Sequence, residues 1–170
     1  RDLQFADPDL QDDIEVVKAA VQQNGLALQY ASTRLKMAKC IVHMAVSDNG
    51  EALQFAAPYL KDDIDIVKAA VSKTGKAYIY ASRSMRNIPE IALAAIPNYG
   101  CALGYANCQI QNDRNVVLKA VENDGLALEY APNYQDDREI VRIAVENNGL
   151  ALEYAPYFQD DRDIVCKAVK

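Results

Sequence analysis

Residues 136–156 read DDREIVRIAVENNGLALEYAP, and variants of this phrase recur about every 25 residues. The glycines mark the period, at Gly25, Gly50, Gly75, Gly100, Gly125 and Gly149. An aromatic residue followed by alanine keeps the same spacing, at Phe5, Tyr30, Phe55, Tyr80, Tyr105, Tyr130 and Tyr154. Self-similarity at a fixed period of this length is typical of repeat architectures, so we expect seven units of about 25 residues.

The second half of each repeat predicts an α-helix. Apolar residues recur at Val16, Val17, Ala20 and Val21 in the first repeat, which places them on one helical face. An aspartate followed three residues later by an acid precedes this face, and the arrangement predicts a capping box. The Asn-Gly pair after it predicts a helix end closed by a left-handed glycine.

The first half of each repeat predicts a short helix that ends at proline or serine, as at Pro132 and Pro156. Two helices this short are not stable in isolation, so stability must come from stacking one repeat on the next. Two invariant alanines per repeat would allow the helices to approach closely. The sequence therefore predicts an all-α fold, a single α-solenoid over residues 1–170 with about seven stacked helix-turn-helix repeats.

The order of the motifs A-L-x-Y-A, D-D-x-E-I-V and A-V-x-x-N-G resembles an uncharacterised α-helical repeat family, a domain of unknown function. The family is found in bacterial proteins, secreted effectors among them, and in protist and algal proteins. Two repeats depart from its pattern, with Met37-Ala38 in one and Asn87-Ile88-Pro89 in the other. The resemblance implies an architecture and no shared activity.

Composition limits the classes of function. The chain of 170 residues has a formal net charge of −6, which argues against nucleic acid or an anionic membrane surface as the main partner. No apolar run reaches the roughly 18 residues of a membrane span, so we expect a soluble domain.

The four cysteines lack metal-ligand or disulfide spacing and are expected to be reduced thiols. Because the chain starts at Arg1 without a signal peptide, we expect a processed or excised piece.

Few residues suggest chemistry. His43, the only histidine, and Cys40 stand at variable helix positions and are expected at the surface. The aromatic series is interpreted as core packing, and the acidic pairs as helix caps rather than a cation-binding ridge. We therefore expect no catalytic residue, no metal, no cofactor and no enzymatic activity.

The fourth repeat departs from the others in charge. It carries Lys76, Arg83 and Arg86 against Glu90 alone, a local charge of +2. A cationic strip in an acidic protein is a candidate for contact with a partner of opposite charge.

Apolar departures occur in the same region. Leu93 and Leu118 stand where other repeats have lysine, histidine, arginine or cysteine. Ile79 stands where most repeats have glutamine or glutamate, and Tyr99 replaces the asparagine that usually precedes the glycine. Together with the cationic strip, these four residues are the candidate partner-binding residues, with an apolar centre and a cationic rim. The alternative is local repacking around the prolines of the fourth repeat.

The sequence thus favours a non-catalytic scaffold of helical repeats that binds another protein, acidic or amphipathic and of unknown identity. Two alternatives stay open. The chain is a structural or accessory subunit of a larger complex, or it is a repeat array attached to an effector or enzyme whose catalytic domain lies elsewhere. Cytoplasm is the default compartment, with an organellar or secreted-effector origin as the other options.

Overall fold

A computed structural model describes residues 3–169, and over this range it contains helices and no β-strand. The all-α repeat fold is therefore confirmed. Each repeat, however, holds three helical pieces instead of the two that we predicted: a 3₁₀ helix that starts at the glycine, a helical turn, and an α-helix. The Cα positions form two compact halves, residues 1–91 and 92–170, and each half is described by itself.

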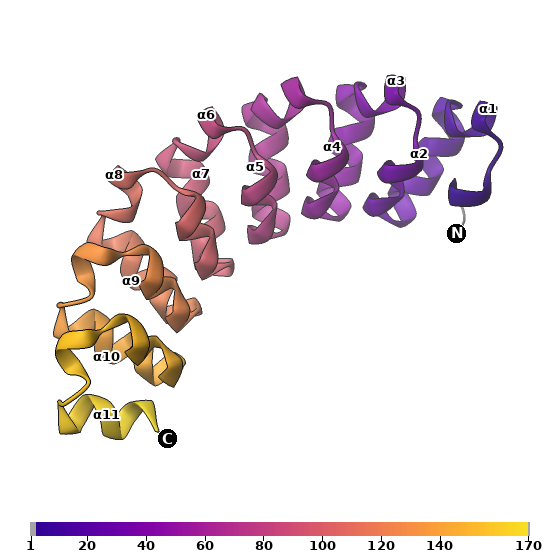
Figure 1. The fold of residues 1–170 in the computed structure, drawn as a ribbon. Coiled ribbons are helices and arrows are strands. Elements are labelled where there is room, and N and C mark those ends of the chain that lie inside the picture. Colours follow the sequence, from indigo (N-terminus) through magenta and orange to yellow (C-terminus); the bar gives the residue numbers. More distant parts are fainter. Residues whose placement is uncertain (1–2, 170) are drawn as a thin grey trace. The chain divides into compact units, whose positions relative to one another are not determined.

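In the N-terminal half the long helices are α2 (Ile14–Gln23), α4 (Lys39–Asp48) and α5 (Ile64–Lys73), which lie side by side (Figure 1). A second layer consists of the 3₁₀ helices η1 (Leu3–Phe5), η2 (Gly25–Tyr30), η3 (Gly50–Phe55) and η5 (Gly75–Tyr80). Short pieces connect the layers: α1 (Pro8–Gln11), α3 (Thr33–Lys36), η4 (Pro58–Asp62) and α6 (Arg83–Arg86). Helix α7 (Pro89–Ala95) crosses the division between the halves.

The C-terminal half repeats this plan. Its α-helices α9 (Arg114–Asn123), α10 (Arg138–Asn147) and α11 (Arg162–Ala168) pack in sequence order (Figure 1). Its 3₁₀ helices η7 (Gly100–Tyr105), η8 (Gly125–Tyr130) and η10 (Gly149–Tyr154) form the second layer. The connecting pieces are η6 (Ile96–Asn98), α8 (Cys108–Gln111), η9 (Pro132–Tyr134) and η11 (Pro156–Phe158).

The α-helices start at the second aspartate of each acidic pair, one residue later than the capping box predicted. The carboxylate of Asp63 accepts hydrogen bonds from the N–H groups of Asp65 at 3.1 Å and Ile66 at 3.2 Å. The acid three residues after the first aspartate is thus at the second position of the helix, and its own N–H is capped. These bonds satisfy two of the N–H groups that a helix start leaves without a partner inside the helix.

In the N-terminal half, the first aspartate of a pair binds residues of the next repeat instead. Asp12 accepts hydrogen bonds from the hydroxyl of Ser32 and from Arg34 Nε, the latter at 3.0 Å. Asp62 accepts in the same way from the hydroxyls of Ser82 and Ser84. An acidic pair therefore joins two repeats while it caps one helix.

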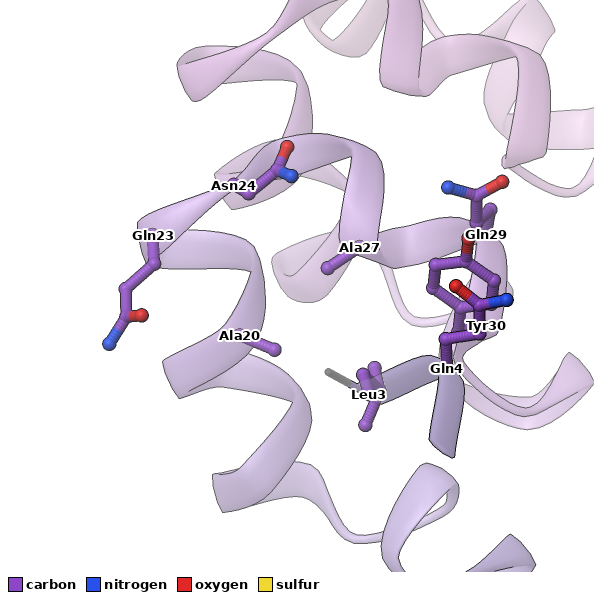
Figure 2. Close-up of a pocket in the computed structure, with 8 residues that line it drawn as sticks. All are labelled: Leu3, Gln4, Ala20, Gln23, Asn24, Ala27, Gln29 and Tyr30. Atoms are coloured by element: carbon purple, nitrogen blue, oxygen red, sulfur yellow. The ribbon is translucent and has the colours of Figure 1, made fainter. Parts of the chain in front are cut away.

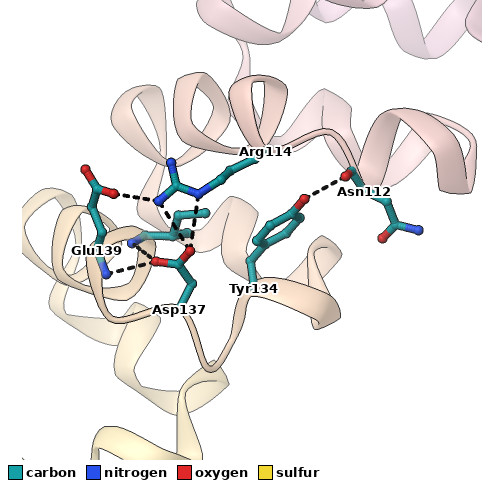
Figure 3. A network of polar contacts seen from close by, with 6 residues as sticks. Asn112, Arg114, Tyr134, Asp137 and Glu139 are labelled. Atoms are coloured by element: carbon teal, nitrogen blue, oxygen red, sulfur yellow. Dashed lines mark hydrogen bonds and ion pairs between the residues drawn. The ribbon is translucent and has the colours of Figure 1, made fainter.

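A ladder of ion pairs continues this linkage, as Figure 3 shows for the C-terminal half. Arg114, at the start of α9, lies 3.3 Å from Asp137 and 2.5 Å from Glu139, both in the next repeat. In the N-terminal half Lys39 lies 2.6 Å from Asp63. Because the caps of one repeat bind the cation of the repeat before it, the acidic pairs are accounted for by the fold.

The repeating glycines differ from the prediction. No glycine among residues 3–169 has a positive φ, so the predicted left-handed helix stop is wrong. Gly25 begins η2, and a Cβ placed on it would lie 2.2 Å from the carbonyl oxygen of Ala45 in the next repeat. A Cβ placed on Gly125 would lie at the same distance from the carbonyl oxygen of Ala144. Glycine is required here because the backbones of two repeats touch.

The core consists of the inner faces of the α-helices and the leucines and alanines of the 3₁₀ helices. In α9, Val116, Val117, Ala120 and Val121 are buried. No polar or charged residue of the described chain is buried. The outer side of each α-helix is thus left for the surface.

Candidate functional site

The α-helix layer of the C-terminal half carries an open groove of about 520 Å³ beside α9. Its lining residues are Leu93, Asp113, Asn115, Val116, Leu118, Lys119 and Glu122. Two of the seven candidate partner-binding residues, Leu93 and Leu118, therefore line one groove, which we call the leucine groove. The two side chains come from equivalent positions of consecutive repeats.

The helices position these leucines on their outer faces. In α9, Val117 and Ala120 are fully buried, whereas Leu118 is half-buried and Lys119 is exposed. Leu93 in α7 is 43% exposed, although its neighbours Ile91 and Ala92 are fully buried. The core therefore contains residues close to each leucine, and the leucine side chains themselves stay in contact with solvent.

Charges of both signs surround the leucine groove. Asp113, Lys119 and Glu122 are exposed, and the carboxylate of Asp113 also caps α9 by accepting the N–H of Asn115 at 2.9 Å. The local rim thus contains two acids and one lysine. A rim of this kind favours an oriented contact more than a general attraction to anions.

The cationic residues of the fourth repeat lie in the N-terminal half. Lys76 forms an ion pair with Glu51 of the preceding repeat, 2.9 Å from its Oε2. Arg83, in α6, is exposed, whereas Ile79 and Arg86 are half-buried. One continuous surface from these residues to the leucine groove stays a prediction, as does the role of all seven residues.

Two neighbouring residues complete the description of this region. The backbone carbonyl of Arg86 accepts a hydrogen bond of 2.6 Å from the hydroxyl of the fully buried Tyr78. Tyr99 is half-buried at the junction of η6 and η7, outside the lining of the leucine groove.

Figure 2 shows a second hollow, of about 490 Å³, in the N-terminal half. Its lining residues are Leu3, Gln4, Ala20, Gln23, Asn24, Ala27, Gln29 and Tyr30. It is comparable in volume to the leucine groove but contains no repeat-breaking residue. Comparison with the equivalent residues of the next repeat explains the hollow.

One repeat later, Ala45 and Asp48 stand at the positions of Ala20 and Gln23, and both contact Gly25. The carbonyl of Ala45 lies against Gly25, and the N–H of Gly25 donates to Asp48 Oδ2 at 2.7 Å. The lining of the hollow is thus the surface that packs against a glycine one repeat later. We therefore assign the hollow to the geometry of stacking and not to a ligand.

The thiol and phenol groups that are most perturbed are poor candidates for chemistry. Burial and the hydrogen bond to Asp124 raise the pKa of Cys101 to about 12, which opposes formation of the nucleophilic thiolate. Burial raises the pKa of Tyr78 to about 12 as well. His43 and Cys40 are exposed, as expected. Within residues 3–169 there is no group of three or more His, Cys, Asp or Glu side chains that could hold a metal ion.

The prediction that the aromatic series packs in the core is wrong for part of the series. Tyr105 is 49% exposed and Phe5 is 80% exposed, while the five others are half-buried. In η7 the fully buried side chains are those of Ala102 and Leu103, so the aromatic residue lies at the rim of the layer.

A family model matches residues 1–36, 39–86, 89–134 and 137–170, which is nearly the whole chain. The chain belongs to the DUF4116 family, a domain of unknown function. Each of the two inner DUF4116 matches spans two of the 25-residue repeats. The whole leucine groove falls within the match over residues 89–134.

No curated protein matches the DUF4116 chain, and no solved structure matches it. In the part of the chain that the structure describes, no helix has the length and apolar character needed to cross a membrane. The repeat architecture is thus established, and the function has to be inferred from the surface.

Proposed function

We propose that the chain is a non-catalytic scaffold that binds another protein in the leucine groove. The observation that supports this is the pair of leucines at one repeat position, lining one groove of about 520 Å³. The five other repeats carry Lys18, His43, Lys68, Arg142 and Cys166 at that position. Packing between repeats therefore does not require leucine there.

The exposed leucines are explained by a contact outside the chain. Apolar side chains at the centre of a groove with a polar rim are typical of the buried core of a protein interface. Burial of the exposed part of Leu93 and Leu118 against a partner would remove apolar surface from water, which stabilises the complex. The acids and the lysine at the rim would fix the orientation of the partner.

An amphipathic helix is the form of partner that suits this site. Its apolar face would contact the two leucines, and basic and acidic side chains would lie near Glu122 and Lys119. Grooves between packed helices commonly receive such a helix through apolar anchors at i, i+3, i+4 and i+7. We propose no nucleic-acid partner and no catalytic step for this site.

The test is the double variant Leu93→Lys/Leu118→Lys, compared with Leu150→Lys. Leu150 is 70% exposed on η10, so the control makes the same chemical change outside the leucine groove. Quantitative affinity capture from native extract, followed by titration of the captured protein, measures the effect. We expect the double variant to fold normally and to lose its partner, and the control to retain it.

Two results would contradict the proposal. Equal capture by the double variant and the wild type would show that the leucine groove is not the contact. A loss of helicity in the double variant, by circular dichroism, would show that the leucines belong to the core.

A further inference from the structure

The 3₁₀ layer differs in charge between the two halves. In the C-terminal half, residues 98–113, 123–137 and 147–161 contain no lysine or arginine. Each of the corresponding stretches 24–38 and 49–63 in the N-terminal half contains at least one. These three stretches of the C-terminal half therefore contain acids and no basic residue, and the acids include Asp124, Glu129 and Glu153.

The tyrosines of this layer are held close together by its packing. Helices η7, η8 and η10 contact one another in order. A Cβ placed on Gly104 would lie 2.8 Å from Cδ1 and 2.9 Å from Cε1 of Tyr130, so the ring of Tyr130 rests against the backbone of η7. Tyr105, next to Gly104, keeps a 49% exposed ring.

Glutamates stand beside these rings. Glu129 and Glu153 are exposed. Burial raises the pKa of Tyr130 and of Tyr154, and the negative charge of Glu129 adds to the rise at both hydroxyls. The charge of Glu129 thus acts on the phenols of two consecutive repeats.

We propose that this tyrosine–glutamate face, formed by Tyr105, Glu129, Tyr130, Glu153 and Tyr154, binds a lysine- or arginine-rich peptide segment of a partner protein. Carboxylates attract the cationic side chains, and the exposed ring of Tyr105 and the half-buried rings of Tyr130 and Tyr154 add cation–π contacts. The face has no cation of its own in the 3₁₀ layer to compete for the acids. The negative charge and the aromatic rings together therefore favour a cationic peptide.

The fold does not require the glutamates. At the same repeat position the N-terminal half carries Gln4, Gln29 and Gln54. Glutamine therefore keeps the shape of the 3₁₀ helix and removes the charge. This makes Glu129→Gln/Glu153→Gln a variant that tests binding separately from folding.

The experiment uses a fluorescein-labelled peptide of alternating glycine, lysine and arginine, titrated with the whole chain and followed by fluorescence anisotropy. A peptide with glutamine in place of every lysine and arginine is the negative control. We expect the cationic peptide alone to bind, and its affinity to fall with added salt because the contacts are exposed to solvent.

A matched variant controls for total charge. The double variants Glu129→Gln/Glu153→Gln and Leu93→Lys/Leu118→Lys both change the net charge by +2. We expect the first to weaken peptide binding about fivefold and the second to leave it nearly unchanged, since exposed ion pairs act locally. Tyr105→Leu should weaken binding about threefold through the lost cation–π contact.

The outcomes separate this inference from the proposed function. An equal loss in the two double variants would show a non-specific attraction to net charge and overturn the proposal. Unchanged binding by Glu129→Gln/Glu153→Gln would overturn it as well. Failure of the leucine groove as a protein contact would not affect these titrations, because the two surfaces share no residue.

Discussion

The repeating glycine is needed for space, and this gives a sharp test at the level of one atom. In Gly125→Ala the new Cβ would lie 2.2 Å from the carbonyl oxygen of Ala144, so two repeats must separate. We expect a loss of about 3 kcal/mol in the free energy of unfolding, from urea titration followed by circular dichroism.

The matched control is Asn147→Ala. Asn147 accepts the N–H of Gly125 at 2.9 Å and donates to the carbonyl of Glu122 at 2.9 Å, so this variant removes hydrogen bonds without adding an atom at the contact. We expect a loss of about 1 kcal/mol. If Gly125→Ala were no worse than Asn147→Ala, the close contact would not be what requires glycine.

The aspartates that cap the helices make stability depend on pH. The hydrogen bond from Lys39 lowers the pKa of Asp63 below its ordinary value of 3.8, against an opposing rise from burial, and the N–H of Ile66 lowers it further. A carboxylate with a lowered pKa stabilises the fold above the unfolded pKa, and the contribution is lost as the pH falls through the folded pKa. We expect the free energy of unfolding, from urea titration, to decrease from about pH 5 downward.

Asp63→Asn isolates the charge in that prediction. Asparagine retains an oxygen that can cap α5, but it forms no ion pair with Lys39. At pH 7 the variant should be less stable than the wild type by up to about 1 kcal/mol, and the difference should shrink towards pH 2 as the pH falls through the folded pKa of Asp63. A difference of the same size at both values would mean that the carboxylate charge contributes nothing.

At the scale of residues, the sequence identified the right positions and gave some wrong reasons. The aspartate pairs and the glycines were recognised because they recur, yet Gly25 faces Ala45, 20 residues away in the chain. A left-handed helix end is the local explanation of such a glycine, and only the distance between two backbones distinguishes it from close packing. The same is true of Asp12, whose partners Ser32 and Arg34 belong to another repeat.

The contact between neighbouring α-helices depends on small side chains. Ala95 and Ala120 are fully buried, so leucine at either position would overpack the core of the C-terminal half. We expect each alanine-to-leucine change to cost about 1–3 kcal/mol of unfolding free energy. Differential scanning calorimetry should show this as a lower midpoint.

Glu122→Gln is the control, because Glu122 is exposed on the same helix as Ala120. Its effect should stay within about 0.5 kcal/mol. Three equal and small effects would mean that the alanines do not form the contact between helices.

The elements themselves were predictable to different degrees. Helix α10 follows from the spacing of Ile140, Val141, Ala144 and Val145, all of which are buried. The 3₁₀ helices were expected as generic short helices, because a six-residue segment such as Gly25–Tyr30 is too short for its period to be read. The exposure of Tyr105 was missed for the same reason, since the face of a helix cannot be assigned before its period is known.

The leucine groove illustrates what the repeat pattern predicts and what it does not. Leu93 and Leu118 are 25 residues apart, so the repeat alone placed them at equivalent points of consecutive helices. The charges at the groove come from α9 and from Asp113, which caps it, whereas the predicted cations belong to the N-terminal half. The repeat register predicts which residues are equivalent, but it does not predict which residues surround a given side chain.

For the whole molecule, stability should be distributed along the chain, because each repeat contacts only its neighbours. Helix α11 illustrates the expected variation. It has Ile164 as its one buried residue within Arg162–Ala168, whereas α10 buries four. Val169 stands where α10 has Val145, and it is 76% exposed.

Hydrogen exchange measured by mass spectrometry on the intact chain tests this distribution. Amides of Arg162–Ala168 should exchange about tenfold or more faster than those of Arg138–Asn147, because full burial of one valine is worth roughly 1.5 kcal/mol of local opening free energy. Equal protection of the two helices would mean that the C-terminal half opens as one cooperative unit. In that case the contact between α10 and α11, and not the burial within each helix, would determine how the array opens.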